Sequence, residues 1–392
     1  MSDRPGSARI LVTTAAGGGA VPASDLRPRD LHRTLPGYAV TPLHDLAGLA
    51  GRLGIGGLWV KDESWRLELP SFKILGGSWA VHRLVLQRAG RPVAGAGLAE
   101  LRAAAAEVGP LTLTTATDGN HGRGVARMAA LLGWDAVVYV PEGTAPARIA
   151  AIEGEGATVV VHPGNYDAAV ARAGADAAEH DRVVIADVAT GDDVEVPTWV
   201  MDGYDTIFDE ADEQLPAPPT TVFLQAGVGA LTAAGIRHYV RAGAVGVPRP
   251  RFATVEPVSA ACLLASAEAG EAVTIDAGQE SIMAGLNCGT PSSVAWPSIV
   301  TNVTAYLAVP DTRAREAMRL LADAGIVSGE SGAAGLAGLL EALAHEHTRD
   351  ALALDGGSRV LLLNTEGATD PAAYRQIVGR TQEDVRAQEA TP

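Results

Sequence analysis

The chain has 392 residues, enough for two domains or one large two-lobed domain, and 47% of them are hydrophobic. Its formal net charge of -16 predicts a surface that disfavours nucleic acid and anionic membranes as partners. No run approaches about 18 uncharged apolar residues, and no basic segment followed by an apolar run opens the chain. We therefore expect neither a membrane span nor a signal peptide and predict a cytoplasmic protein.

The two cysteines, Cys262 and Cys288, are too few for a disulfide framework. No CxxC pair and no cluster of histidines and cysteines suggests a zinc site, so we expect no metal. Reduced thiols are the simpler interpretation because cytoplasmic conditions oppose disulfides. The sequence still leaves a single disulfide between them open.

The predicted elements follow a loose lead-in of 38 residues that is rich in Gly, Ala, Pro and Arg and holds one expected strand, residues 9–13. From Gly57 onward, short β-branched runs alternate with helical stretches rich in Ala and Leu. The strands expected there are residues 58–61, 111–115, 136–140, 158–161, 183–187, 222–226, 252–256 and 360–364. The helices expected between them include residues 76–87, 122–132, 167–179 and 311–324.

This alternation predicts an α/β fold with parallel sheets that carry helices on both faces. Right-handed crossovers in such a fold place ligands at the carboxyl ends of the strands. The acidic, proline-bearing residues 209–219 (DEADEQLPAPP) are the best candidate for a crossing between lobes. We expect the polar tail after Gln382 to fray.

A first candidate for chemistry is the sequence Ser71-Phe72-Lys73, which follows residues 61–64 (KDES) and precedes Gly76 and Gly77. A lysine at the start of a helix can be desolvated there, which lowers the pKa of its amine and prepares it to bond a carbonyl carbon. On spacing alone, a surface lysine near a helix start is the more common case.

Two glycine-rich loops each follow a predicted strand and lead into a helix: residues 115–124 (TATDGNHGRG) and residues 225–230 (QAGVGA). Glycines let backbone amides converge, and a helix N-terminus adds partial positive charge, so such loops can bind a carboxylate or a phosphate. Each has an ordinary alternative, since Asp-Gly-Asn is a common turn and a lone histidine is usually structural. The second loop also resembles part of a dinucleotide fingerprint, and the next strand ends in Glu256, which keeps a Rossmann-type nucleotide enzyme as an alternative.

Two further polar segments lie near the end of the chain, residues 328–332 (SGESG) and 364–367 (NTEG). The latter ends an apolar strand, where an α/β fold presents polar groups to a ligand. An ordinary turn between strand and helix is the alternative.

Taken in order, from Thr41-Pro42-Leu43 through the lysine segment and both glycine loops to the last polar strand end, the chain resembles the fold-type II pyridoxal-phosphate (PLP) family of tryptophan synthase β and threonine dehydratase. The resemblance covers residues 38–375. It implies two lobes, each an open, mostly parallel twisted sheet flanked by helices. The implied domains are a large PLP-binding domain of residues 1–87 and 215–392 and a small substrate-contacting domain of residues 88–214.

Within that family, the chain most resembles the diaminopropionate ammonia-lyases. The segments that carry this likeness are residues 115–124, 197–199, 203–204, 225–229, 282–289, 328–332 and 365–371. By this resemblance, Lys73 would hold PLP covalently and Asn120 would bind its phenolic oxygen. The remaining cofactor contacts would come from Phe72, from the backbone amides of Gly227, Val228 and Gly229 to the phosphate, and from Thr365 to the pyridine nitrogen.

The resemblance also implies that Lys73, Asp118 and Asp187 are catalytic, and that Thr117, Asp118, Gly119, His121 and Asp187 contact the substrate. PLP delocalises the electrons left when Cα loses a proton, which Lys73 could accept. A neutral hydroxyl at the ring nitrogen favours prompt loss of a β-substituent over a long-lived carbanion. Asp118 and Asp187 could recognise a β-amine, and one of them could act on the opposite face of Cα.

Other functions on this scaffold remain open at the level of sequence. Residues 188–196 (VATGDDVEV) lack the aromatics of the closest family pattern, and Leu69-Pro70-Ser71 reads like the general fold-type II pattern. The alternatives are a serine/threonine or hydroxyaspartate dehydratase, a β-replacement synthase, or a ligand-binding protein without catalysis. A small amino-acid substrate and a homodimer are expected by resemblance.

Overall fold

The computed structural model describes residues 7–13, 27–117, 119–189, 193–276 and 281–389. The chain divides into unit 1, within residues 1–23, 40–65 and 207–392, and unit 2, within residues 24–39 and 66–206. The expected large domain of residues 1–87 includes residues 24–39 and 66–87, which this division assigns to unit 2, and residues 207–214 of the expected small domain fall in unit 1. The physical reason is that helix α3 (Lys73–Arg88) packs on helices α5 and α8 of unit 2.

Unit 1 is built on a seven-stranded sheet in the order β1-β10-β9-β8-β11-β3-β2. The five inner strands are parallel, and the two edge strands β1 and β2 are antiparallel to their neighbours. The strands are β1 (Arg9–Val12), β2 (Leu43–Asp45), β3 (Gly57–Asp62), β8 (Thr221–Gln225), β9 (Arg251–Pro257), β10 (Val303–Val309) and β11 (Arg359–Asn364). The inner strands are almost continuously buried, as parallel strands covered on both faces require.

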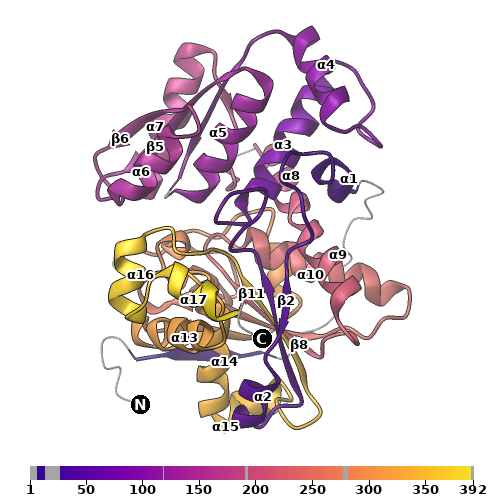
Figure 1. The fold of residues 1–392 in the computed structure, drawn as a ribbon, viewed down its shortest axis with the longest axis vertical. Coiled ribbons are helices and arrows are strands. Elements are labelled where there is room, and N and C mark those ends of the chain that lie inside the picture. The colour runs from indigo at the N-terminus through magenta and orange to yellow at the C-terminus, as the bar shows by residue number, and fades with distance from the viewer. Residues whose placement is uncertain (1–6, 14–26, 118, 190–192, 277–280, 390–392) are drawn as a thin grey trace. The chain divides into compact units, whose positions relative to one another are not determined.

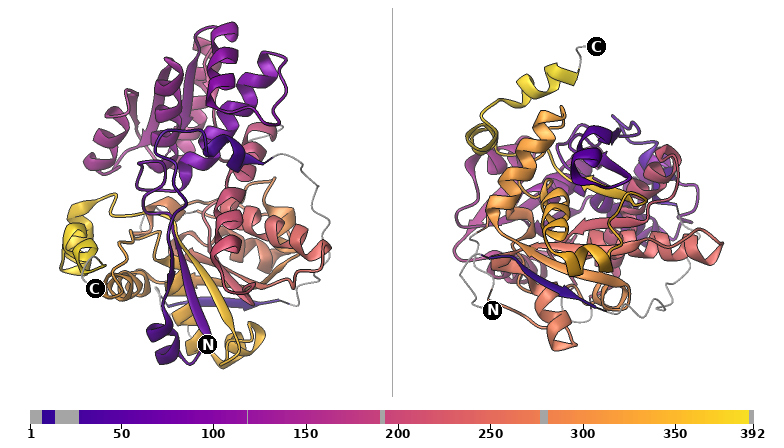
Figure 2. Two further views of the ribbon diagram at one scale, coloured as in Figure 1. Left: turned by 45° about the vertical axis from the view of Figure 1, so that its right-hand side comes forward. Right: turned by 90° about the horizontal axis from the view of Figure 1, so that it is seen from below.

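The helices of unit 1 pack on this sheet or on one another (Figure 1). They are α2 (Ala47–Leu53), α9 (Asp205–Gln214), α10 (Ala230–Ala244), α11 (Cys262–Ala269), α12 (Trp296–Val300), α13 (Asp311–Asp323), α14 (Ala334–Ala344), α15 (Glu346–Ala351), α16 (Pro371–Val378) and α17 (Gln382–Glu389), with 3-10 turns at Val258–Ala260 and Ala284–Leu286. Figure 2 shows α16 and α17, coloured yellow, as neighbours at the end of the chain.

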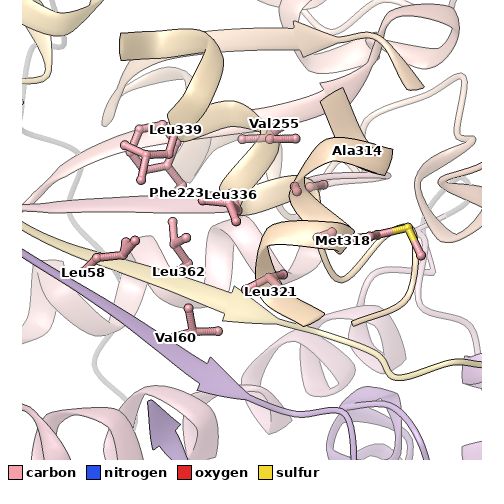
Figure 3. Close-up of a cluster of buried hydrophobic side chains, with 14 of the residues drawn as sticks. Leu58, Val60, Phe223, Val255, Ala314, Met318, Leu321, Leu336, Leu339 and Leu362 are labelled. Atoms are coloured by element: carbon pink, nitrogen blue, oxygen red, sulfur yellow. The ribbon is translucent and has the colours of Figure 1, made fainter. Parts of the chain in front are cut away.

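The core of unit 1 lies where α13 and α14 pack on the inner strands (Figure 3). Leu336 and Leu339 of α14 lie close to Phe223 of β8 and Val255 of β9, and all four side chains are buried. Gly338 allows this contact, because a Cβ there would come 2.3 Å from Val255 Cγ2.

Unit 2 holds a fully parallel four-stranded sheet in the order β6-β5-β4-β7. Its strands are β4 (Thr112–Ala116), β5 (Asp135–Pro141), β6 (Thr158–His162) and β7 (Val183–Val184). Its helices are α1 (Pro28–His32), α3 (Lys73–Arg88), α4 (Leu98–Val108), α5 (Asn120–Leu132), α6 (Pro146–Glu153), α7 (Tyr166–His180) and α8 (Glu195–Gly203). Helices α5 and α7 pack on β4 and β5, which places the start of α5 at the carboxyl end of β4.

The sheets confirm the expected α/β class, and every expected strand overlaps an observed one. Strands β2 and β10 were missed, since β2 has three residues and β10 contains alanine and leucine, which favour helices as much as strands. Two expectations were wrong. The expected crossing at residues 209–219 lies wholly within unit 1, where its acidic half belongs to helix α9, and the tail after Gln382 forms helix α17. Among the described residues, no helix is both long and apolar enough to span a membrane.

Candidate functional site

Lys73 is the first residue of α3 and forms a partly buried ion pair within unit 2. Its Nζ donates a 2.7 Å hydrogen bond to Oδ2 of Asp187. The Lys73 side chain is 20% exposed and that of Asp187 is 9% exposed. The structure therefore brings together two of the three expected catalytic residues, one from a helix start and one from the segment after β7.

The Asp187 carboxyl is held ionised by its neighbours. Burial favours its neutral form, but the Lys73 ammonium, the nearby His121 and the Tyr166 hydroxyl together hold the pKa of Asp187 well below its usual range. Tyr166, the first residue of α7, donates a 3.2 Å hydrogen bond to Oδ1 of Asp187. Each carboxylate oxygen of Asp187 therefore has its own donor.

The first glycine loop connects β4 to α5, and Asp118 within it lies outside the described residues. Gly119 has a φ of 148°, a conformation that favours glycine, and its amide donates to Oγ1 of buried Thr117 at 3.0 Å. Asn120 then begins α5. The side chain of His121 is buried, and its Nε2 lies 2.8 Å from the Ile185 carbonyl oxygen. That contact ties α5 to the segment that carries Asp187.

Close packing of α3 on α5 sets the position of Lys73 relative to this loop. A Cβ on Gly124 of α5 would come 3.0 Å from the Ile74 Cα, and one on Gly122 would come 2.4 Å from Thr117 Cγ2. The second and third glycines of the loop motif therefore allow a close backbone approach beside Lys73.

Aromatic rings pack around the start of α3. The Phe72 ring is buried and lies 4.7 Å from the Tyr204 ring between centroids, and Lys73 Nζ lies 5.7 Å from the Phe72 centroid. A Cβ on Gly76 would come 2.7 Å from Tyr204 Cε1, so this glycine makes room for the tyrosine. Burial raises the pKa of Tyr204, which keeps its hydroxyl neutral beside the amine.

The second glycine loop, in unit 1, leaves three adjacent backbone donors unused. Among the described residues, no acceptor receives a hydrogen bond from the amides of Gly227, Val228 or Gly229. These residues follow β8 and precede α10, and Gly229 adopts a φ of 94°. A Cβ on Gly227 would come 2.9 Å from Cys288 Sγ. Unpaired amides at the start of a helix form an anion-binding site.

Thr365 follows β11 in unit 1 and is buried at 3% exposure. Its Oγ1 accepts a 3.0 Å hydrogen bond from Nε2 of Gln225 at the end of β8. No disulfide joins the two cysteines of this unit, Cys262 and Cys288, in this structure.

Sequence reasoning assigned no role to Tyr166 or Gln225, which contact Asp187 and Thr365. Tyr166 stands alone at a helix start, with no motif around it to signal its contact. Gln225 was included in the motif QAGVG, but its side-chain partners come from segments more than 100 residues away.

The residues of each unit fit one part of PLP on structural grounds. In unit 2, the partly buried Lys73 amine can bond an aldehyde. In unit 1, the three unused amides before α10 suit a phosphate, and Thr365 adds a buried hydroxyl at a strand end that can bond a ring nitrogen.

Comparison with known proteins agrees with this fit. The family model described as pyridoxal-phosphate dependent enzyme matches residues 34–366. A diaminopropionate ammonia-lyase of Salmonella typhimurium is 40% identical over 364 residues, which cover 88% of this chain and 90% of that protein.

Two solved structures of Escherichia coli diaminopropionate ammonia lyase each cover 95% of this chain and 97% of their own. The complex with D-serine has a TM-score of 0.87 at 35% identity. The complex with an aminoacrylate-PLP azomethine reaction intermediate has a TM-score of 0.84 at 34% identity. This chain therefore belongs to the fold-type II PLP-dependent enzymes and, within them, to the diaminopropionate ammonia-lyase family.

Proposed function

We propose that this chain converts 2,3-diaminopropionate and one water into pyruvate and two molecules of ammonia. The observation that carries the proposal is the partly buried 2.7 Å contact between the Lys73 amine and the Asp187 carboxylate. A lysine amine can hold an aldehyde cofactor and transfer protons. A carboxylate beside it can pair with the second ammonium group that distinguishes diaminopropionate from ordinary amino acids.

Lys73 would hold PLP covalently, and the cofactor, when bound, delocalises the electrons left as Cα loses its proton. The amides of Gly227, Val228 and Gly229 would bind its phosphate because they have no other acceptor among the described residues. The remaining proposed contacts are Asn120 to the phenolic oxygen, Thr365 to the ring nitrogen and Phe72 as a packing neighbour.

Asp187 would recognise the β-ammonium of the substrate. Its Oδ2 already accepts from one ammonium group, that of Lys73, so an amine of the same charge can take this place when Lys73 is engaged elsewhere. The hydrogen bond from Tyr166 to Oδ1 would keep the carboxylate in the required rotamer. Thr117, Gly119 and His121 would flank the α-carboxylate of the substrate, and Asp118 would act as a second acid there.

Proton transfer would use the same groups. Lys73, once released by the incoming substrate, would take the Cα proton from one face, and Asp118 or Asp187 would act on the other. An unprotonated amine is a poor leaving group, so the ionised acid paired with the β-nitrogen would keep that nitrogen as an ammonium group until it departs as ammonia.

The test is a substrate panel with the purified, PLP-loaded protein. Release of pyruvate and ammonia is measured with both enantiomers of diaminopropionate, with D- and L-serine, with L-threonine and with 3-hydroxyaspartate. We expect kcat/KM for at least one diaminopropionate enantiomer to exceed that for each hydroxy amino acid by about 100-fold. The reason is that a buried carboxylate strongly favours a substrate whose second ammonium group can pair with it over one that has a hydroxyl there. Faster turnover of serine or hydroxyaspartate would instead make the chain a dehydratase.

We also propose that the chain forms a homodimer, by family resemblance, and that it acts in the cytoplasm. Light scattering after size exclusion would give twice the 40.2 kDa of one chain. A mass of one chain at micromolar concentration would contradict the dimer.

A further inference from the structure

Gln225 has an unusual set of hydrogen-bond partners for a buried amide. Its side chain is 2% exposed, and Nε2 lies 2.9 Å from the Leu363 carbonyl oxygen and 3.0 Å from Thr365 Oγ1. The carbonyl oxygens of Ser331 and Gly332 each lie 3.3 Å from the same nitrogen. Four acceptors therefore surround a group that carries two hydrogens.

These neighbours fix the orientation of the Gln225 amide. Backbone carbonyls can only accept, so the atom that faces the three of them must be the nitrogen. A flipped amide would point Oε1 at three other oxygens. The observed orientation leaves Oε1 buried without a donor among the described residues, and an unsatisfied buried acceptor destabilises a fold. The fold thus retains a strained hydrogen-bond arrangement at Gln225.

The fixed amide in turn fixes the hydroxyl of Thr365. Since Nε2 donates to Oγ1, the hydroxyl hydrogen of Thr365 must point away from Gln225. No acceptor within the described parts of the chain receives that hydrogen. Thr365 therefore presents a hydrogen-bond donor to whatever lies beside it.

We propose that Gln225 is a positioning residue that holds Thr365 as a donor toward the ring nitrogen of PLP and so keeps that nitrogen unprotonated. The inference rests on the proposed function, because it requires PLP with its ring nitrogen at Thr365. A ring nitrogen with a free lone pair accepts the Thr365 hydrogen. A protonated nitrogen would need Thr365 to accept instead, and the hydrogen that Gln225 directs outward would then oppose the N–H group.

The experiment follows the 15N NMR signal of the ring nitrogen in the holoenzyme loaded with 15N-labelled PLP, from pH 6 to 9. We expect the signal of the unchanged protein to stay at the unprotonated position throughout. A protonated wild-type signal at neutral pH would overturn the proposal without any variant. Thr365→Asp, whose carboxylate accepts from a pyridinium, marks the protonated position.

Gln225→Met removes the amide donor and keeps an unbranched side chain of similar length. The carbonyls of Leu363, Ser331 and Gly332 then lack a donor, and the Thr365 hydroxyl turns toward them, so its lone pairs face the ring nitrogen. We expect the 15N signal to move toward the protonated position as the pH falls. We also expect kcat to drop about 10-fold with little change in KM, as is typical when a supporting hydrogen bond is removed.

Gln214→Met is the matched control, because Gln214 also donates from Nε2 to a backbone carbonyl in unit 1, that of Thr41 at 3.0 Å. Its 15N signal should be that of the unchanged protein. Should Gln225→Met fail to fold, Gln225→Asn keeps a donor for the carbonyls but is one methylene too short for Thr365, and its signal should also move. Wild-type signals in a folded Gln225 variant would overturn the proposal.

Failure of the proposed function gives a different result. If the protein binds no PLP, the cofactor assignment fails. If Thr365→Val leaves the 15N signal unchanged, the proposed contact between Thr365 and the ring nitrogen fails. If Thr365→Val changes the signal and Gln225→Met does not, the cofactor assignment stands and the role of Gln225 is rejected.

Discussion

Each unit of this protein holds a lysine–carboxylate pair, and the two pairs have different surroundings. In unit 1, Lys61 and Glu210 are both fully buried, and Lys61 Nζ donates at 2.9 Å to Glu210, at 2.7 Å to the Thr41 carbonyl and at 2.7 Å to Gln214. All three hydrogens of this ammonium group therefore have protein acceptors. In unit 2, Lys73 is 20% exposed and its carboxylate partner is Asp187.

This difference separates a lysine that stabilises the fold from a lysine that can react. The amine of Lys61 would have to break three hydrogen bonds and leave Glu210 uncompensated before it could react. Lys73 lies at a helix start, keeps an accessible fraction and shares its partner with Tyr166. Lys61 lies near the end of β3 and Lys73 begins α3, so both lie close to the end of a regular element and only their surroundings distinguish them.

Replacement of Lys73 should have the largest effect. We expect Lys73→Ala to lose the visible absorbance of the lysine-bound cofactor and at least about 1,000-fold in kcat/KM, since both cofactor attachment and proton transfer depend on this amine. The fold should persist, because the Asp187 side chain still accepts from Tyr166. Absorbance spectra and pyruvate release measure the loss, and an unaltered spectrum would assign the cofactor to another lysine.

Replacement of Lys61 should reverse that pattern. Lys61→Met leaves the Glu210 carboxylate buried without its cation, and we expect a loss of about 3–5 kcal/mol in the free energy of unfolding. The cofactor absorbance of the folded fraction should be unchanged. Denaturant unfolding measures the loss, and the double variant Lys61→Met, Glu210→Gln should recover much of it. A stable Lys61→Met protein that fails to hold PLP would contradict the division between the two lysines.

Replacement of Asp187 tests whether the Lys73–Asp187 pair also selects the substrate. Asp187→Asn keeps the shape and removes the charge, so we expect kcat/KM for diaminopropionate to fall about 100-fold, a loss on the scale of a charge-assisted hydrogen bond plus proton transfer. Any turnover of serine should fall far less, because serine has no second ammonium. Equal losses on both substrates would remove Asp187 from substrate recognition.

The layout of strands and helices could be predicted well from the sequence. The pairing of side chains from distant segments could not. Buried β-branched runs such as residues 222–226 specify strands, and glycines before helices specify the loops at their carboxyl ends. The short β7 ends at Val184, before Asp187, because Ile185 gives its carbonyl to His121 while its amide bonds Thr114. Such contacts between distant segments leave no period or spacing in the sequence.

The candidate site shows the same division. Lys73, Gly227 and Thr365 lie at junctions that a pattern of strands and helices already marks. Tyr166 and Gln225 act through other side chains, and their partners lie 21 and 140 residues away along the chain. Asp118 lies outside the described residues, so its role stays a prediction.

His82, a buried base, extends the comparison of buried ionisable groups to the dependence of stability on pH. His82 of α3 is fully buried and bonds the Ala96 carbonyl at 2.9 Å. Burial, only partly offset by that carbonyl, lowers its pKa from 6.5 to about 4. Below pH 6.5 the unfolded chain binds a proton that the folded chain does not accept until about pH 4, so stability falls across this window.

We expect this loss to reach about 2–3 kcal/mol at pH 4, allowing for partial relaxation around the ring. His82→Gln, which can still donate to the Ala96 carbonyl, should flatten the dependence of the unfolding free energy on pH between 6.5 and 4. Urea unfolding at a series of pH values measures it. An equally steep decline in the variant would assign the acid sensitivity to other groups.

Replacement of Tyr166 should have the smallest effect. It tests how the carboxylate of the Lys73–Asp187 pair in unit 2 is oriented. Tyr166→Phe removes the hydrogen bond to Asp187 Oδ1 and leaves the bond from Lys73 to Oδ2. The carboxylate can then rotate, so we expect kcat/KM for diaminopropionate to fall about 5- to 10-fold while the cofactor spectrum stays unchanged. Tyr374→Phe removes a buried phenol hydroxyl in the core of unit 1 and serves as the matched control. If both variants lose the same small fraction of activity, Tyr166 does not orient Asp187, and Lys73 alone sets the position of that carboxylate.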